Sequence, residues 1–175
     1  MISERRRLLK LLSILLQYPE EEWIHRVEEL RDALKLIPKP EVQERCTVFL
    51  NYLAATPLIR LQENYTATFD LSPNTCLNLT YHRWGDARER GNALVAFHHL
   101  YQSSGYESTT GDLPDYLPLV LEFVSVNRQQ SPILLGQYCD QVETIGSRLQ
   151  ENGSPYAGVF EIVMEIFREL QASAA

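Results

Sequence analysis

Residues 5–19, RRRLLKLLSILLQYP, decide how the start of the chain is interpreted. Arginines before an apolar stretch resemble a twin-arginine export signal, but such a signal also needs a longer apolar segment and a small-residue cleavage site. Here the apolar stretch spans only Leu11–Leu16 and soon meets Pro19. The leucines instead repeat at the three- and four-residue spacing of one helix face: Leu8, Leu11, Leu12, Leu15 and Leu16. The stretch therefore predicts a core helix that ends before Pro19.

The composition excludes several classes of protein. The 175 residues suffice for a full apolar core, and we expect a single domain over residues 1–175. The net charge of −7 argues against nucleic acid as a partner, because phosphate binding needs clustered Lys and Arg. No apolar run is long enough to span a bilayer, so we expect a soluble, cytoplasmic protein without membrane insertion. The sequons Asn64-Tyr65-Thr66 and Asn78-Leu79-Thr80 carry no weight without an export signal.

Helical periodicity extends along nearly the whole chain, and no stretch alternates apolar and polar residues as paired strands do. Cap-then-proline pairs at Thr56-Pro57, Ser131-Pro132 and Ser154-Pro155 mark three helix starts. Gly105 is typical of the position just after a helix end. We expect an all-α bundle of about eight or nine helices, the first ending before residue 19 and the others near 23–37, 40–53, 57–69, 76–82, 86–103, 114–127, 131–151 and 154–171.

The segment between residues 63 and 123 differs from plain amphipathic scaffold. Large amphipathic rings lie near its helix ends and loops, at Tyr81, Trp84 and Tyr116, where such rings often form recognition surfaces. The alternative is that these rings only cover the core.

Asp115 lies between Pro114 and Pro118, either in the first turn of a helix or in an extended segment before it. In both cases its carboxylate can be exposed to a cation of a partner. The alternative is an aspartate that only offsets the helix dipole.

Metal binding and catalysis have weak support in the sequence. His98 and His99 point about 100° apart on a helix and cannot both face one ion. No P-loop, G-x-G-x-x-G or G-x-S-x-G motif is present. We therefore predict a protein that is not an enzyme and holds no cofactor or metal. The alternative is a small helical enzyme or metal protein that uses His82, His98 or Asp115.

Several motifs of the chain resemble one family. They are Tyr65 with Phe69-Asp70, WGDARERGNAL at 84–94, LPDYLP at 113–118, LEF at 121–123 and LLQYP at 15–19. Together they resemble the NarJ branch of the TorD/DmsD/NarJ family, the cytoplasmic chaperones dedicated to molybdenum-cofactor oxidoreductases. The family pattern has His after the aspartate, where this chain has Tyr116.

The resemblance implies an all-helical, TorD/NarJ-like chaperone for the catalytic subunit of a nitrate-reductase-type molybdoenzyme. It would bind the N-terminal leader of that subunit and hold the subunit for molybdenum-cofactor insertion before membrane assembly. A leader that is disordered alone can fold as an amphipathic helix on its partner, and Asp70, Asp115 or Glu122 would meet its basic end. The predicted peptide-binding residues are Tyr65, Phe69, Asp70, Tyr81, Trp84, Arg88, Arg90, Asp115, Tyr116, Leu117, Pro118 and Glu122.

Several alternatives stay open at this point. The client can be another respiratory molybdoenzyme, such as a selenate, chlorate or dimethyl sulfoxide-type reductase. The protein can also be a structural subunit that stays with its complex. We expect a monomer, with a dimer as the alternative. If Asp115 meets the leader directly, Asp115→Asn should weaken leader binding and leave folding nearly unchanged.

Overall fold

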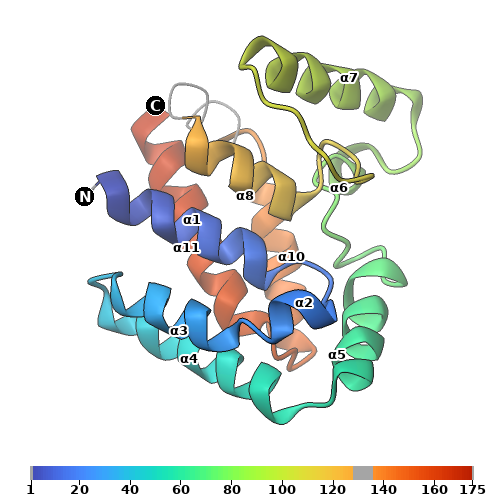
Figure 1. The fold of residues 1–175 in the computed structure, drawn as a ribbon. Coiled ribbons are helices and arrows are strands. Elements are labelled where there is room, and N and C mark those ends of the chain that lie inside the picture. Colours follow the sequence, from blue (N-terminus) through green and yellow to red (C-terminus); the bar gives the residue numbers. More distant parts are fainter. Residues whose placement is uncertain (1, 128–135, 175) are drawn as a thin grey trace.

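The computed structural model describes residues 2–127 and 136–174, which form a packed set of helices joined by turns and loops (Figure 1). No strand forms within these ranges, although Asn78 and Tyr116 make an isolated antiparallel bridge. The prediction of an all-α fold is confirmed. None of the helices in the described ranges is both long and apolar enough to cross a bilayer.

The leucine-rich start of the chain forms α1 (Ile2–Leu15), which packs along α8 (Leu117–Val126) (Figure 1). All the leucines predicted to face the core are buried, which confirms a core helix. On the outer face of α1, Arg5 forms an ion pair with Glu169 and Lys10 forms one with Glu122. The helix therefore divides by face as its sequence predicts, with leucines inside and cations in water.

The next predicted helix is split into α2 (Glu21–Ile24) and α3 (Val27–Lys35), with a turn between them. Then α4 (Pro40–Ala55) begins with proline in its first turn, as predicted, and packs against α3. Proline is favourable there because its missing N–H would have no partner in the helix. The apolar side chains that repeat at helical spacing along α4 are all buried: Val42, Cys46, Phe49 and Leu53.

The fourth predicted helix is α5 (Leu58–Tyr65), which continues into a π-helical turn, η1 (Thr66–Asp70). The cap predicted at Thr56 is wrong, because α5 begins after Pro57 without a side-chain cap. In η1 the Leu71 N–H donates to the Thr66 carbonyl at 2.9 Å, five residues back. This wider turn leaves Phe69 buried and Asp70 exposed.

Two helices lie toward one edge of the molecule, α6 (Tyr81–Trp84) and α7 (Arg88–Ser103) (Figure 1). Gly85, with φ +54°, makes the turn between them. Gly105, with φ +66°, follows the end of α7 as predicted.

The chain closes with α10 (Cys139–Glu151) and α11 (Ala157–Ala174), which pack against each other. Ser154 caps the turn before α11, as predicted, since its hydroxyl accepts the Tyr156 N–H at 3.3 Å. The helix start predicted at 131–132 lies outside the described residues. Buried apolar side chains from all the longer helices join in one core cluster, α1 and α11 contributing many of them.

Candidate functional site

Asp115 is completely buried, with an exposed fraction of 0%. Its Oδ2 atom accepts the Thr80 N–H at 3.0 Å and the Thr80 hydroxyl at 2.5 Å. Its Oδ1 atom accepts the side-chain amide of Asn78 at 3.0 Å. The expectation that this carboxylate is exposed is therefore wrong. A peptide on the surface cannot reach it without opening the structure.

The backbone joins the same two segments. The Leu79 N–H donates to the Asp115 carbonyl at 3.1 Å, and the Leu117 N–H donates to the Leu77 carbonyl at 2.8 Å. Asp115 lies in a turn before α8 and not in the first helical turn, and the extended residue at the helix start is Tyr116. Residues 77–80 and 115–117 thus form one small structural unit, held by both backbone and side-chain hydrogen bonds.

Arg90 connects this unit to α7. Its Nε atom donates to the Thr80 hydroxyl at 3.2 Å, and its guanidinium lies over the Tyr81 ring, 5.3 Å from the centroid. A second stacked pair follows in α6, where the Arg83 guanidinium lies 4.7 Å from the Trp84 ring centroid. Tyr81, Trp84 and Arg90 are each half-buried.

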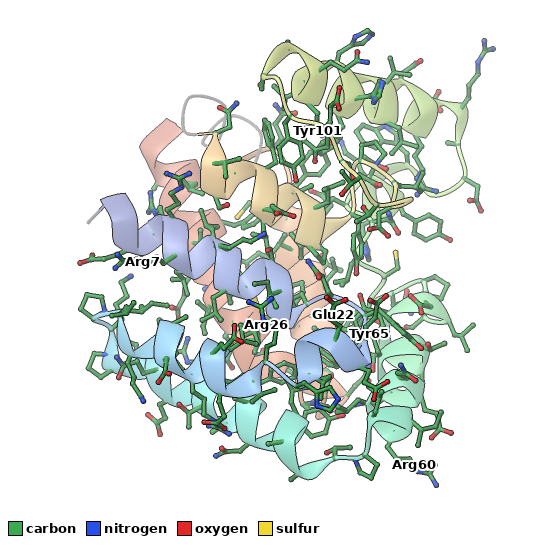
Figure 2. All side chains as sticks on the ribbon, viewed as in Figure 1. Arg7, Glu22, Arg26, Arg60, Tyr65 and Tyr101 are labelled. Carbon is green, nitrogen blue, oxygen red and sulfur yellow. The ribbon has the colours of Figure 1, made fainter. Side chains whose placement is uncertain are left out.

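Tyrosine hydroxyls connect the end of α1 with α5 and the start of α8. Tyr65 is labelled in Figure 2. Its hydroxyl donates to the Leu16 carbonyl at 3.0 Å and lies 2.5 Å from the Tyr116 hydroxyl. Because the carbonyl only accepts, Tyr116 must donate to Tyr65. The Tyr116 oxygen in turn accepts the backbone N–H of Tyr18. Burial raises the pKa of both Tyr65 and Tyr116, so each hydroxyl keeps its proton.

Two carboxylates lie near this tyrosine chain. Asp112 and Asp70 both raise the pKa of the Tyr116 hydroxyl, after the larger effect of burial. Both are exposed, and neither has an ion pair or hydrogen bond among the described residues. Exposed apolar side chains follow each of them in the sequence, Leu71 at 76% and Leu113 at 45%. The surface around Tyr116 is therefore both acidic and apolar, and we call these five residues the Tyr116 surface.

The other predicted residues differ in where they lie. Leu117 and Pro118 are buried in the first turn of α8, as are Tyr65 and Phe69 in their own segment. Because these four side chains are buried, they are not exposed for direct contact with a peptide. Arg88 is exposed at the start of α7.

Glu122 belongs to a different contact. Its carboxylate pairs with Lys10 of α1 and accepts a hydrogen bond from the Tyr106 hydroxyl. Burial is the main reason that the pKa of Tyr106 rises to about 12, with a further contribution from Glu122. This carboxylate already has two partners where α1 meets α8.

The sequence reasoning missed four residues of the site: Tyr18, Asn78, Thr80 and Asp112. The signal that could have found two of them was the Asn78-Leu79-Thr80 triplet, which was considered only as a glycosylation sequon. Its Asn and Thr side chains instead donate to the buried carboxylate.

Two of the groups suggested for an enzyme or metal protein, His82 and Asp115, have structural partners. The His82 Nε2 atom lies 2.7 Å from the Cys76 carbonyl, and burial lowers the pKa of His82. Burial also raises the pKa of Cys76, which keeps its thiol protonated and unreactive. Among the described residues, no three His, Cys, Asp or Glu side chains gather so as to hold a metal ion.

Comparisons with known proteins place the chain among its relatives. The family model described as nitrate reductase delta subunit matches residues 38–161. The Bacillus subtilis protein named probable nitrate reductase molybdenum cofactor assembly chaperone NarJ is 32% identical over 163 residues, which cover 93% of this chain and 89% of that protein. The Escherichia coli nitrate reductase molybdenum cofactor assembly chaperone NarJ is 31% identical over 162 residues, covering 90% and 68%.

A solved structure has the same fold. It is described as a redox enzyme maturation protein from Archaeoglobus fulgidus and matches with a TM-score of 0.63 at 22% identity, over 97% of this chain and 93% of that one. The relatives carry the names of assembly chaperones and not of enzymes, in agreement with the prediction from the sequence. The chain therefore belongs to the nitrate reductase delta subunit family, in the NarJ branch of the TorD/DmsD/NarJ proteins.

Proposed function

We propose that this protein is a dedicated chaperone for the catalytic subunit of a nitrate-reductase-type molybdoenzyme, and not an enzyme itself. The observation that supports this proposal is the similarity to two NarJ chaperones over 93% and 90% of the chain. The chaperone binds the N-terminal leader of the subunit and holds it in the cytoplasm. The subunit is released for membrane assembly after the molybdenum cofactor has been inserted.

The Tyr116 surface suits such a leader. An amphipathic helical segment offers apolar anchors, for which Leu71 and Leu113 provide exposed apolar partners. A basic end of the leader matches the carboxylates of Asp70 and Asp112, which have no ion pair within the part of the chain that the structure describes. Arg88 and the half-buried rings of Tyr81 and Trp84 extend the surface on the side of α6 and α7. Asp70 is thus the predicted contact residue that we retain as the first choice.

Purification of the tagged protein from its native cell tests the proposal. We expect one large oxidoreductase catalytic subunit in the eluate, poor in molybdenum cofactor, because a chaperone binds its client before the cofactor is inserted. Recovery of a mature, cofactor-loaded enzyme complex would instead make the protein a structural subunit. A client other than a nitrate reductase would correct the substrate class and leave the chaperone role in place.

Calorimetry with a synthetic peptide of the client's leader tests the surface. We expect a negative heat-capacity change, because apolar area is buried on binding. The double variant Asp70→Asn/Asp112→Asn should weaken binding by about tenfold, or ~1.4 kcal/mol. Glu44→Gln is the matched control, since Glu44 is an exposed carboxylate on α4 without an ion pair among the described residues. Equal losses in the control and the double variant would rule out a specific role for Asp70 and Asp112.

A further inference from the structure

We infer that Asp115 is a positioning residue: a buried latch that holds residues 81–103, the α6–α7 arm, against the start of α8. The inference replaces direct contact between Asp115 and the leader with an indirect role. The position of the arm follows from the structure alone. Only the effect on leader binding rests on the function proposed above.

The two halves of α7 are attached to the body in different ways. Its C-terminal half is held by buried rings, since Tyr101 packs 4.6 Å from Phe123 of α8 and Phe97 packs 5.5 Å from Tyr138, measured between centroids. The hydroxyl of Tyr101, which Figure 2 labels, also donates to the Pro114 carbonyl at 2.6 Å. In the N-terminal half, residues 88, 89, 91 and 92 are exposed, and the Arg90 side chain contacts the body through Thr80.

Arg90 is attached through Thr80, and Thr80 through Asp115. The Thr80 hydroxyl accepts from Arg90 and donates to the Asp115 carboxylate, so the three groups form a chain from guanidinium to carboxylate. The same carboxylate fixes the Thr80 N–H directly before α6 begins. Both the start of α6 and the start of α7 therefore depend on this one buried group.

A carboxylate is better suited to this place than an amide. Asp115 accepts from three donors and has no water contact, so a neutral side chain with its own N–H group cannot satisfy all of them in the same way. Hydrogen bonds to an ionised acceptor are also stronger than those to a neutral one. Asp115→Asn keeps the shape of the side chain but weakens the attachment of the arm.

The latch also bears on the Tyr116 surface. Tyr116 follows Asp115 directly, and its backbone forms the antiparallel bridge with Asn78. When the latch opens, Tyr81 and Trp84 on one side of this surface lose their fixed position relative to Tyr116. A site that is formed only part of the time binds its ligand more weakly in proportion to the fraction formed. If about a tenth of the molecules stay closed, leader affinity falls about tenfold.

Trp84 of the arm provides a direct readout. The chain has two tryptophans, so Trp23→Phe leaves Trp84 as the single tryptophan, and excitation that selects tryptophan over tyrosine reports on it alone. In this background we expect Asp115→Asn to shift the emission to longer wavelength and to increase quenching by acrylamide, while the far-UV circular dichroism stays helical. Thr80→Val should act in the same direction, because it removes the hydroxyl between Arg90 and Asp115. Thr80→Ser, which keeps the hydroxyl, should resemble the parent.

Leu50→Ala is the control for general loss of stability, since Leu50 is fully buried in α4, far from α7 in Figure 1. Below its melting temperature it should leave Trp84 emission unchanged. Unchanged Trp84 emission in Asp115→Asn and Thr80→Val would overturn the latch. A loss of leader affinity in Asp115→Asn without any change at Trp84 would also overturn it and favour direct contact. If Trp84 emission shifts in Asp115→Asn and Thr80→Val but the parent protein binds no leader, the latch is supported and the proposed function is refuted.

Discussion

The hydroxyl of Tyr65 offers a sharp test of how the first half of the fold is held to the second. The change is Tyr65→Phe, which removes one oxygen and keeps the ring in its contacts with Phe69 at 4.9 Å and Tyr18 at 5.4 Å. The variant loses the hydrogen bond to the Leu16 carbonyl and the one from the Tyr116 hydroxyl. Each is worth about 0.5–1.5 kcal/mol, so the unfolding free energy should fall by about 1–3 kcal/mol.

The measurement is denaturant and thermal unfolding followed by circular dichroism. For a chain of this length a loss of 1 kcal/mol lowers the melting temperature by about 2–4 °C, so a fall of about 2–12 °C is expected. Tyr116→Phe is the comparison: it leaves the buried bond from Tyr65 to Leu16 intact, but it loses the bond to the Tyr65 hydroxyl and the bond accepted from the Tyr18 N–H. It should therefore also cost about 1–3 kcal/mol. Losses in the double variant should be smaller than the sum, because both single variants break the same hydrogen bond. If Tyr65→Phe is as stable as the wild type, the Tyr65 hydroxyl does not hold the first half of the fold to the second.

Three further predictions follow from individual contacts. Burial lowers the pKa of His82, so the stability contributed by its neutral form is present above the ordinary pKa of 6.5 and is lost as the pH falls. His82→Gln should therefore make the unfolding free energy fall less steeply on acidification. An unchanged slope of unfolding free energy against pH would contradict this. A Cβ on Gly146 would lie 2.1 Å from the Met164 sulfur, so Gly146→Ala should lower the unfolding free energy by about 1–3 kcal/mol. Gly91 of α7 has open space around it, so Gly91→Ala should raise the unfolding free energy by about 0.5–1 kcal/mol in the same assay. Arg168→Ala should change the unfolding free energy by less than about 1 kcal/mol, because its pair with Glu143 is exposed to water; a larger loss would mean that the pair orders α10 against α11.

The helices could be predicted because the signals that specify them are local. In α1 and α4 the apolar residues repeat with the helical period, and every one that the pattern assigns to the core is buried. Proline at the start of α4 and glycine after α7 mark helix ends through their own backbone preferences. Such signals depend only on residues within a few positions of one another, so they can be recognised from the sequence alone.

The site could be predicted only in part, because its contacts join residues distant in the sequence. Asp115 is 35 residues from Thr80, and Tyr65 is 51 residues from Tyr116. No periodicity links such pairs, so the burial of Asp115 and the pairing of the tyrosines had no signal in the chain. The π-helical turn at Thr66–Asp70 could not be predicted for another reason. The spacing of apolar residues is nearly the same in an α-helix that continues and in one that widens for a single turn.

The burial of Asp115 changes how the LPDYLP motif is to be understood. In this segment Leu117 and Pro118 start α8 inside the core, and Asp115 binds the 78–80 segment. The half-buried Tyr116 and the exposed Leu113 instead lie on the surface with the carboxylates of Asp70 and Asp112. A motif shared with a chaperone family can thus be required for building a surface, and its residues need not contact the client. Residues that choose a client should then be sought among the exposed neighbours of Tyr116, since a buried latch serves any leader equally.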